Sequence, residues 1–198
     1  MTWIGRSSDN VHDCVLLSPS KNTLYIVNIN SMTLHYSLAL WIKANGLPVC
    51  FSARNNQYGT FNTPLSGKVA AVKLVHLYGY VTCHKYNADN WSFWGCGHGA
   101  KDLVNVVVTR SNNQMILPAN QFIGNRAGRW SKLPGYNSFS PEIVLSFFSS
   151  PLSLSAQTQL RLWYGEDLVS HTEGDNDGRV CTDVYVLYVW ESLTIRPF

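Results

Sequence analysis

Carboxylate side chains are concentrated in one short segment of this chain. Six of its 12 Asp and Glu residues lie between Glu166 and Asp183, where Arg179 is the only Lys or Arg. Carboxylates this close together repel one another unless a cation lies among them. We therefore expect the segment to bind a metal ion. The alternative is a solvated acidic loop whose internal repulsion is screened by salt.

The spacing of these acids indicates which metal ion the segment binds. The run Glu173-x-Asp175-x-Asp177-Gly178 places oxygen ligands on alternate residues before a glycine, as in the first half of an EF-hand loop. The second half is missing, because Val184 stands where an EF-hand has its bidentate Glu. Oxygen ligands suit Ca²⁺ better than zinc or copper. The sequence thus predicts a Ca²⁺ loop on a β scaffold.

Aromatic residues flank the acidic segment. Leu162-Trp163-Tyr164 runs directly into it, and Trp91-Ser92-Phe93-Trp94 lies in a loop of small polar residues. Sugars offer C–H faces to aromatic rings and paired hydroxyls to carboxylates or Ca²⁺, so these groups together would form a carbohydrate site. For any single Trp, burial in the core is the alternative. The predicted sugar-binding residues are Trp163, Tyr164, Trp91, Trp94, Asn90 and His171.

Composition excludes several other classes of protein. The net charge is only +3, and no Lys/Arg run of the kind that follows phosphates is present, so we expect no nucleic-acid partner. No apolar stretch approaches the roughly 18 residues of a spanning helix, so we expect no membrane insertion. The first six residues lack the pattern of a signal peptide, which leaves either a cytosolic protein or the mature form of a secreted one.

The five cysteines favour the secreted form. Cys83 and Cys96 bracket an aromatic loop and are spaced to close a disulfide across a hairpin, while Cys50 and Cys181 lie in strand-like runs and can pair. Cys14 would then be left for an intermolecular bridge or for burial. The alternative is five reduced, buried cysteines. No C-x-x-C pair is present, so a thiolate zinc site is not expected.

Strand signals dominate the chain, and turn residues such as Asn45-Gly46 and Asp177-Gly178 separate them. Without a convincing amphipathic helix between them, these runs predict an all-β fold, an antiparallel β-sandwich of jelly-roll type. Val180 to Trp190 is apolar on both faces apart from Asp183, which is the pattern of a central strand covered on both sides. The expected strands are 23–28, 33–42, 69–76, 79–83, 104–110, 114–117, 142–148, 159–164 and 179–190.

The first 45 residues contain less turn punctuation than the rest. We expect residues 1–45 to form an N-terminal arm or extra strands packed on the same domain. Residues 46–198 are then the β-sandwich carbohydrate-binding domain.

Four stretches carry a resemblance to a known family. The acidic run Leu160–Tyr185, the pieces around Cys50 and Val72–Cys83, and Trp91–Cys96 resemble a domain of extracellular coral and sea-anemone proteins. That domain is similar to the calcium-dependent galactose-binding lectins of sea anemones. The resemblance covers about residues 47 to 190 and omits the N-terminal arm.

The resemblance implies a secreted β-sandwich, usually a homo-oligomer, that holds galactose hydroxyls through bound Ca²⁺. Asp177 is the acid least suited to a ligand role, because its side chain is expected to face solvent. Galactose-containing glycans or glycoproteins are the implied partners. The ligand candidates are Glu166, Asp167, Glu173, Asp175, Asn176 and Asp183.

Two other functions compete with a lectin. One is an extracellular adhesion or skeletal-matrix module, in which calcium only braces the loop and the partner is a protein. The other is a glycosidase that uses a pair of these acids. Carboxylates crowded around a metal would all stay ionised, which leaves no general acid, so we expect no enzyme activity.

Overall fold

The computed structural model describes residues 12–18, 23–30, 33–147, 150–190 and 194–195, and for residues 12–37 and 194–195 it describes the backbone alone. Most elements in it are strands, which confirms the all-β prediction. No helix in this described part is long and apolar enough to cross a membrane. The strands are β1 (His12–Ser18), β2 (Thr23–Asn30), β3 (Thr33–Lys43), β4 (Val49–Ser52), β5 (Gly59–Asn62), β6 (Gly67–Thr82), β7 (Val106–Arg110), β8 (Met115–Leu117), β9 (Ile123–Asn125), β10 (Trp130–Ser131), β11 (Glu142–Ser146), β12 (Leu152–Leu154), β13 (Gln159–Tyr164), β14 (Asp177–Trp190) and β15 (Thr194–Ile195).

Short helices lie between some of these strands. The only α-helix in the described ranges is the four-residue α1 (Gly165–Leu168). The 3₁₀ turns are η1 (Ala88–Asn90), η2 (Gly97–Ala100), η3 (Asn120–Phe122) and η4 (Glu173–Asp175).

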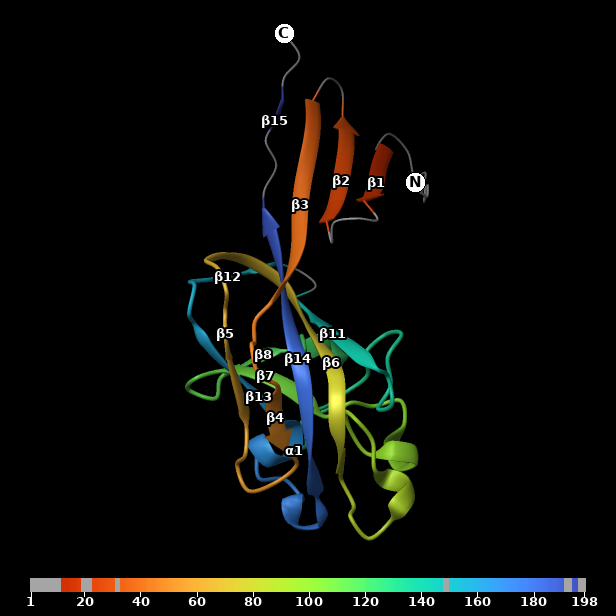
Figure 1. Cartoon of the computed structure of the whole chain (residues 1–198). Coiled ribbons are helices and arrows are strands. Elements are labelled where there is room, and N and C mark those ends of the chain that lie inside the picture. Colours follow the sequence, from red (N-terminus) through yellow and green to blue (C-terminus); the bar gives the residue numbers. More distant parts are fainter. Residues whose placement is uncertain (1–11, 19–22, 31–32, 148–149, 191–193, 196–198) are drawn as a thin grey trace.

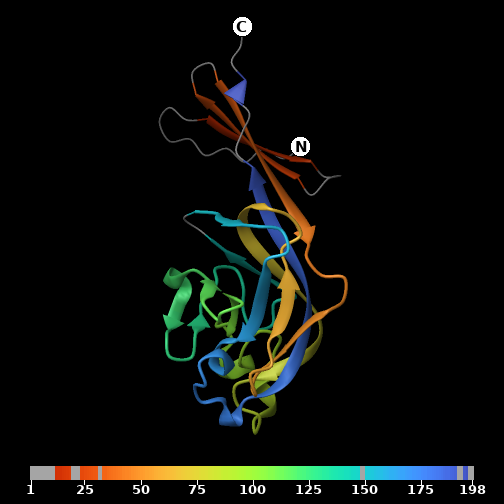
Figure 2. The same ribbon diagram turned by 90° about the vertical axis from the view of Figure 1, so that its left-hand side faces the viewer.

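Two antiparallel sheets pack face to face (Figure 2). The larger sheet has the order β1-β2-β3-β14-β6-β11, with β4 also on β14, β12 on β6 and β15 on β3. The smaller sheet has the order β5-β13-β7-β8, and β9 and β10 form a separate hairpin. Figure 1 shows β1, β2, β3 and β15 at one end of the molecule and α1 at the opposite end.

One hydrophobic core fills the space between the sheets. The larger sheet contributes Phe51, Leu74 and Val184, and the smaller sheet contributes Val108 and Leu160, all without exposed surface. Each such side chain contributes roughly 1.5–3 kcal/mol when it leaves water. The core therefore fixes the position of the strand ends between which the acidic segment runs.

Strands β6 and β14 run through the centre of the larger sheet. We expected two strands over 69–83, but β6 continues through both, with a register irregularity opposite Cys181 and Thr182. The central position of β14 is confirmed, since it pairs with β3 and β4 on one side and with β6 on the other. Its outward side chains, such as Tyr185, are only half-buried, and Lys73 lies 5.2 Å from the Tyr185 ring.

Both expected disulfides are present. Cys50–Cys181 joins directly opposed residues of β4 and β14, and Cys83–Cys96 closes the aromatic loop that follows β6. The alternative of five reduced cysteines is therefore wrong. Cys14 lies in β1, where only the backbone is described.

Candidate metal and ligand site

The acidic segment connects the two sheets at one end of the sandwich. Strand β13 of the smaller sheet ends at Tyr164, α1 follows at once, and η4 leads into β14 of the larger sheet. The segment must therefore cross from one layer to the other over about a dozen residues. Both of its ends are anchored in core strands, which limits how far its side chains can move apart.

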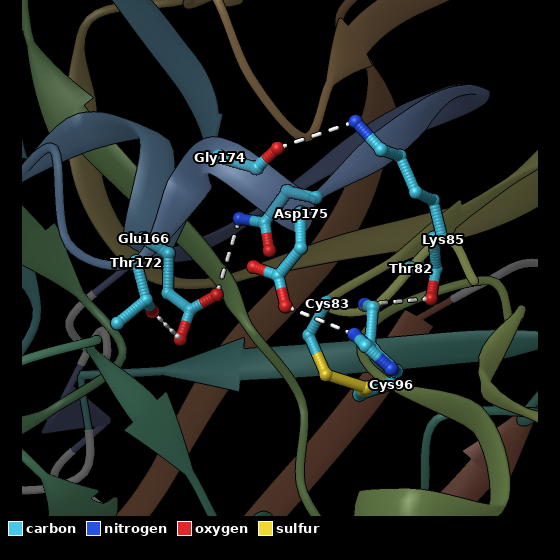
Figure 3. Close-up of polar contacts among 10 residues, drawn as sticks. Thr82, Cys83, Lys85, Cys96, Glu166, Thr172, Gly174 and Asp175 are labelled. Carbon is cyan, nitrogen blue, oxygen red and sulfur yellow. Dashed lines mark hydrogen bonds and ion pairs between the residues drawn. A yellow bond between two sulfur atoms is a disulfide. The ribbon is translucent and has the colours of Figure 1, made fainter. Parts of the chain in front are cut away.

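Glu166 is buried in this crossing and is fully hydrogen-bonded. Its Oε1 accepts from the Trp130 indole N–H at 2.9 Å and from the Thr172 hydroxyl at 3.2 Å. Its Oε2 accepts from the Asn176 amide at 3.1 Å. Figure 3 shows the Thr172 contact. Three donors stabilise this buried carboxylate, so Glu166 holds the loop together and has no oxygen free of a protein donor.

Asn176 is oriented by the groups that its amide nitrogen contacts. The nitrogen donates to Glu166 Oε2 at 3.1 Å and to the Ala53 carbonyl at 3.2 Å. The amide oxygen must then point away from both acceptors. Asn176 Oδ1 is buried and has no hydrogen-bond partner.

Asp167 also carries a buried oxygen without a partner. Its Oδ1 accepts from the Asn56 backbone N–H at 2.9 Å, whereas Oδ2 has no partner. The side chain of Glu173 lies within hydrogen-bonding reach of Asp167, and Glu173 Oε2 is likewise buried, so the two carboxyl groups satisfy each other only when one of them carries a proton. The pKa of Asp167 is raised to about 6, first by burial and then by Glu173, although the Asn56 and Gln57 backbone N–H groups lower it.

When both carboxyl groups are ionised, buried oxygens of this kind are costly, because each has lost water without gaining a donor. Asp167, Glu173 and Asn176 supply one each, and all three are the hard oxygen ligands that Ca²⁺ takes. No group of three or more His, Cys, Asp or Glu side chains in the described ranges is arranged to hold a metal. A donor set here needs the Asn176 amide besides the two carboxylates. These residues fit a calcium ion by donor chemistry.

Backbone conformation around this set is unusual. Asn55 and Asn56, in the loop between β4 and β5, have positive φ values of 67° and 55°, and Ser170 and Thr172 have 50° and 51°. Non-glycine residues in the left-handed region cost about 1 kcal/mol each and are frequent at ligand-binding loops. The two strained loops are joined at the hydrogen bond from Asn56 to Asp167.

Asp175 and Asp183, also predicted as ligands, have protein partners instead. Asp175 Oδ2 lies 3.0 Å from His84 Nδ1, beside the Cys83–Cys96 disulfide (Figure 3). Asp183 Oδ2 lies 2.8 Å from Lys43 Nζ, and Asp183 Oδ1 accepts from the Asn45 amide at 3.0 Å. Asp183 is six residues further along β14 than Asp177, which is about 20 Å in a strand. The structure therefore does not bring it to the other acids.

The structure places the predicted sugar-binding residues in different surroundings. Trp94 and Tyr164 have no exposed surface, and Trp163 is 3% exposed beneath Tyr58, with ring centroids 4.5 Å apart. Trp91 is half-buried against the start of β14, next to Gly178, and the backbone of His171 bonds to the Glu166 carbonyl. The Asn90 side chain accepts from the Gly99 N–H.

Tyr58 and Asn56 are site residues that the sequence patterns did not single out. The exposed fraction of Tyr58 is 37%, and the Arg161 guanidinium lies 4.3 Å from its ring centroid. Neither residue lies near the acidic segment in sequence. The Asn55-Asn56 pair is a turn signal, but nothing in the sequence connects it to Asp167.

The fold and this loop define the chain as a two-layer β-sandwich with an oxygen-lined site at one end. Among solved structures, it is similar to AJLec, a lectin from the sea anemone Anthopleura japonica, with 37% sequence identity and a TM-score of 0.65. The similarity covers 74% of this chain and 95% of AJLec. The chain therefore belongs to the family of this sea-anemone lectin, as the resemblance predicted. No protein-family model and no curated protein sequence matches it.

Proposed function

We propose that the chain is a calcium-dependent lectin that binds galactose-type glycans and has no catalytic activity. The observation that carries this proposal is the set of three buried oxygens without partners, on Asp167, Glu173 and Asn176. Membership of a sea-anemone lectin's family supports the carbohydrate ligand. The dependence on calcium and the preference for galactose are the two properties that the calorimetric titration tests.

The residues of the site have separate tasks in this proposal. Asp167, Glu173 and Asn176 would hold the ion, while Glu166 fixes the Asn176 side chain by accepting from its amide nitrogen. A bound Ca²⁺ would supply coordination positions for two neighbouring hydroxyls of the sugar. Galactose differs from glucose in its axial 4-hydroxyl, which changes the hydroxyl pair that it presents. The Tyr58 ring already contacts Trp163, with centroids 4.5 Å apart, and the Arg161 guanidinium, 4.3 Å from its centroid, so Tyr58 would meet the sugar with its exposed edge and hydroxyl.

The proposal extends to the domain organisation, the secretion and the oligomeric state of the chain. We propose residues 46–198 as the carbohydrate-binding domain and residues 1–45 as extra strands packed on it; in the described part of the arm, β3 pairs with β14. We also propose a secreted homo-oligomer, in which several weak sites together give useful avidity. The two disulfides are typical of an oxidising compartment and support secretion.

Calorimetric titration of calcium, followed by galactose, tests the proposal. We expect calcium to bind the metal-free protein and galactose to bind only afterwards. Asp167→Asn and Glu173→Gln should each weaken calcium binding at least tenfold, since each removes a charged ligand. Asp177→Asn is the matched control, because Asp177 lies in the same segment but pairs with Arg54 at 3.3 Å.

Two results would contradict the proposal. Retention on galactose-agarose that survives EDTA would exclude a role for calcium in sugar binding. Calcium binding without any galactose binding would instead favour the adhesion or skeletal-matrix module, with calcium as a brace for the loop.

A further inference from the structure

A polar cavity of about 500 Å³ lies beside the proposed calcium site. Its lining residues are Cys50, Ser52, Asn56, Gln57, Tyr58 and Arg179. Asn56 belongs to both places, because it lines the cavity while its backbone N–H donates to Asp167 Oδ1 at 2.9 Å. Asn56 is therefore the residue through which the cavity borders the proposed calcium site.

Arg179 is the charged group of the cavity. It lies on β14 opposite Ser52 of β4 and Tyr80 of β6, and its side chain is exposed, whereas that of the next residue, Val180, points into the core. Its guanidinium has no ion pair or hydrogen bond to any other residue in the described part of the chain. The acid two positions earlier on β14, Asp177, is engaged by Arg54 at 3.3 Å.

The lining contains no Asp or Glu. The side chains of Arg179, Asn56 and Tyr58 offer a guanidinium, an amide and a hydroxyl, all of which can donate hydrogen bonds. An unpaired guanidinium among donors, without a competing carboxylate, suits sulfate or carboxylate, whose oxygens match its planar fork.

The cavity is also held in shape without a ligand. The Cys50–Cys181 disulfide fixes β4 to β14 at its base. The Ser52 hydroxyl lies 2.9 Å from Gln57 Oε1, and the Ser52 backbone N–H donates to the Gln57 carbonyl at 2.9 Å. These bonds hold the loop that carries Asn56 and Tyr58, so little ordering is needed when a ligand binds.

We propose that this cavity binds the acidic group of a glycan, a sulfate or a sugar carboxylate, carried next to the galactose unit at the calcium site. This inference rests on the proposed lectin function and narrows the ligand class to acidic galactosides. The site then combines two cationic groups, the calcium ion and Arg179, which an acidic glycan engages together.

Calorimetric titrations with three sugars in excess calcium test the proposal: lactose, 3′-sulfated lactose and 3′-sialylated lactose. We expect the full chain to bind at least one acidic sugar about fivefold more tightly than lactose, the effect of one exposed charge-assisted contact. The two acidic arms distinguish sulfate from carboxylate. The preference should shrink as sodium chloride is raised, because the contact is solvent-exposed.

Arg179→Gln should remove the acidic preference and leave the affinity for lactose unchanged. The matched control is Lys132→Gln, which removes the same charge from an exposed residue in a different cavity, of about 730 Å³. Arg179→Lys keeps the charge but loses the fork, and should retain part of the preference. Thermal unfolding midpoints equal to that of the unsubstituted chain establish that each variant is folded.

The possible outcomes separate this inference from the proposed function. If lactose binds and neither acidic sugar binds more tightly, the acidic cavity is overturned and the lectin proposal stands. The same holds if Lys132→Gln removes the acidic preference as fully as Arg179→Gln does. Arg179-dependent binding of the sulfated sugar without lactose binding overturns the galactose proposal and supports the acidic cavity.

Discussion

Asp167 and Asp183 belong to the same acidic segment but lie in opposite surroundings. Asp167 is fully buried, faces another carboxylate and keeps one oxygen without a partner. Asp183 is partly exposed and is paired with Lys43 and Asn45. The difference teaches that carboxylate density alone does not identify a ligand. The cation that balances a carboxylate can be a lysine of the chain, and only an acid without such a partner calls for a metal.

Calcium itself should give the largest effect on this comparison. Added calcium is expected to stabilise the fold, since it binds the native loop and not the unfolded chain, by about 2.7 kcal/mol at a free concentration 100 times the dissociation constant. Thermal unfolding with calcium and with EDTA measures this. An unfolding midpoint that calcium leaves unchanged would mean that the Asp167 cluster holds no ion.

Asn176→Ala should give the next largest effect. The change deletes a proposed ligand and also removes the donor to Glu166 Oε2, which leaves a buried carboxylate oxygen unpaired. We expect a loss of about 1–3 kcal/mol in unfolding free energy even without calcium. Urea denaturation in EDTA measures it, and Asn45→Ala at the Asp183 pair is the comparison variant. An equal loss at both positions would argue against a special role for the buried cluster.

The two aspartates should respond to pH in opposite directions. The folded pKa of Asp167 is raised to about 6 from the ordinary 3.8 of an aspartate, so the metal-free native state binds the additional proton. Its stability should fall as pH rises from about 4 to 6, by on the order of 1 kcal/mol. Burial raises the pKa of Asp183, but the hydrogen bonds from Lys43 and Asn45 outweigh it and lower the pKa overall. The stability that the lowered pKa of Asp183 contributes is present above pH 4 and is lost on further acidification.

Comparing the unsubstituted chain with Asp167→Asn in EDTA isolates the pH dependence of stability that Asp167 causes. Denaturation at pH 4, 5, 6 and 7 should show stability falling as pH rises in the unsubstituted chain and not in the variant. Calcium affinity should also weaken below about pH 6, because protons compete for Asp167. Calcium affinity that is independent of pH between 5 and 7 would exclude Asp167 as a ligand.

Asp183→Asn should give the smallest effect. Its pair with Lys43 is partly exposed, and exposed pairs are worth roughly 0.2–1 kcal/mol. We expect a stability loss in this range and unchanged calcium affinity. A tenfold loss of calcium affinity in this variant would restore Asp183 as a ligand, as the sequence pattern suggested.

The sequence predicted the longer strands better than the short ones. Val180 to Trp190 was recognisable because a central strand is apolar over its length, and the structure places it in β14. The strand-like run around Cys50 corresponds to β4, whereas β5 was missed because it has four residues and too few alternations for a period to show. The disulfide Cys50–Cys181 was predicted correctly from two residues that are 131 positions apart.

The sequence alone determined which carboxylates are close along the chain in the acidic segment. It also determined that together they favour a hard cation. Only the tertiary structure decided which of them are balanced by the chain itself. The partners Lys43, Asn56 and His84 are supplied by the end of β3, the β4–β5 loop and the segment after β6, all distant in sequence. Burial and hydrogen bonding depend on these long-range contacts, because a carboxylate loses its water only when other segments pack over it.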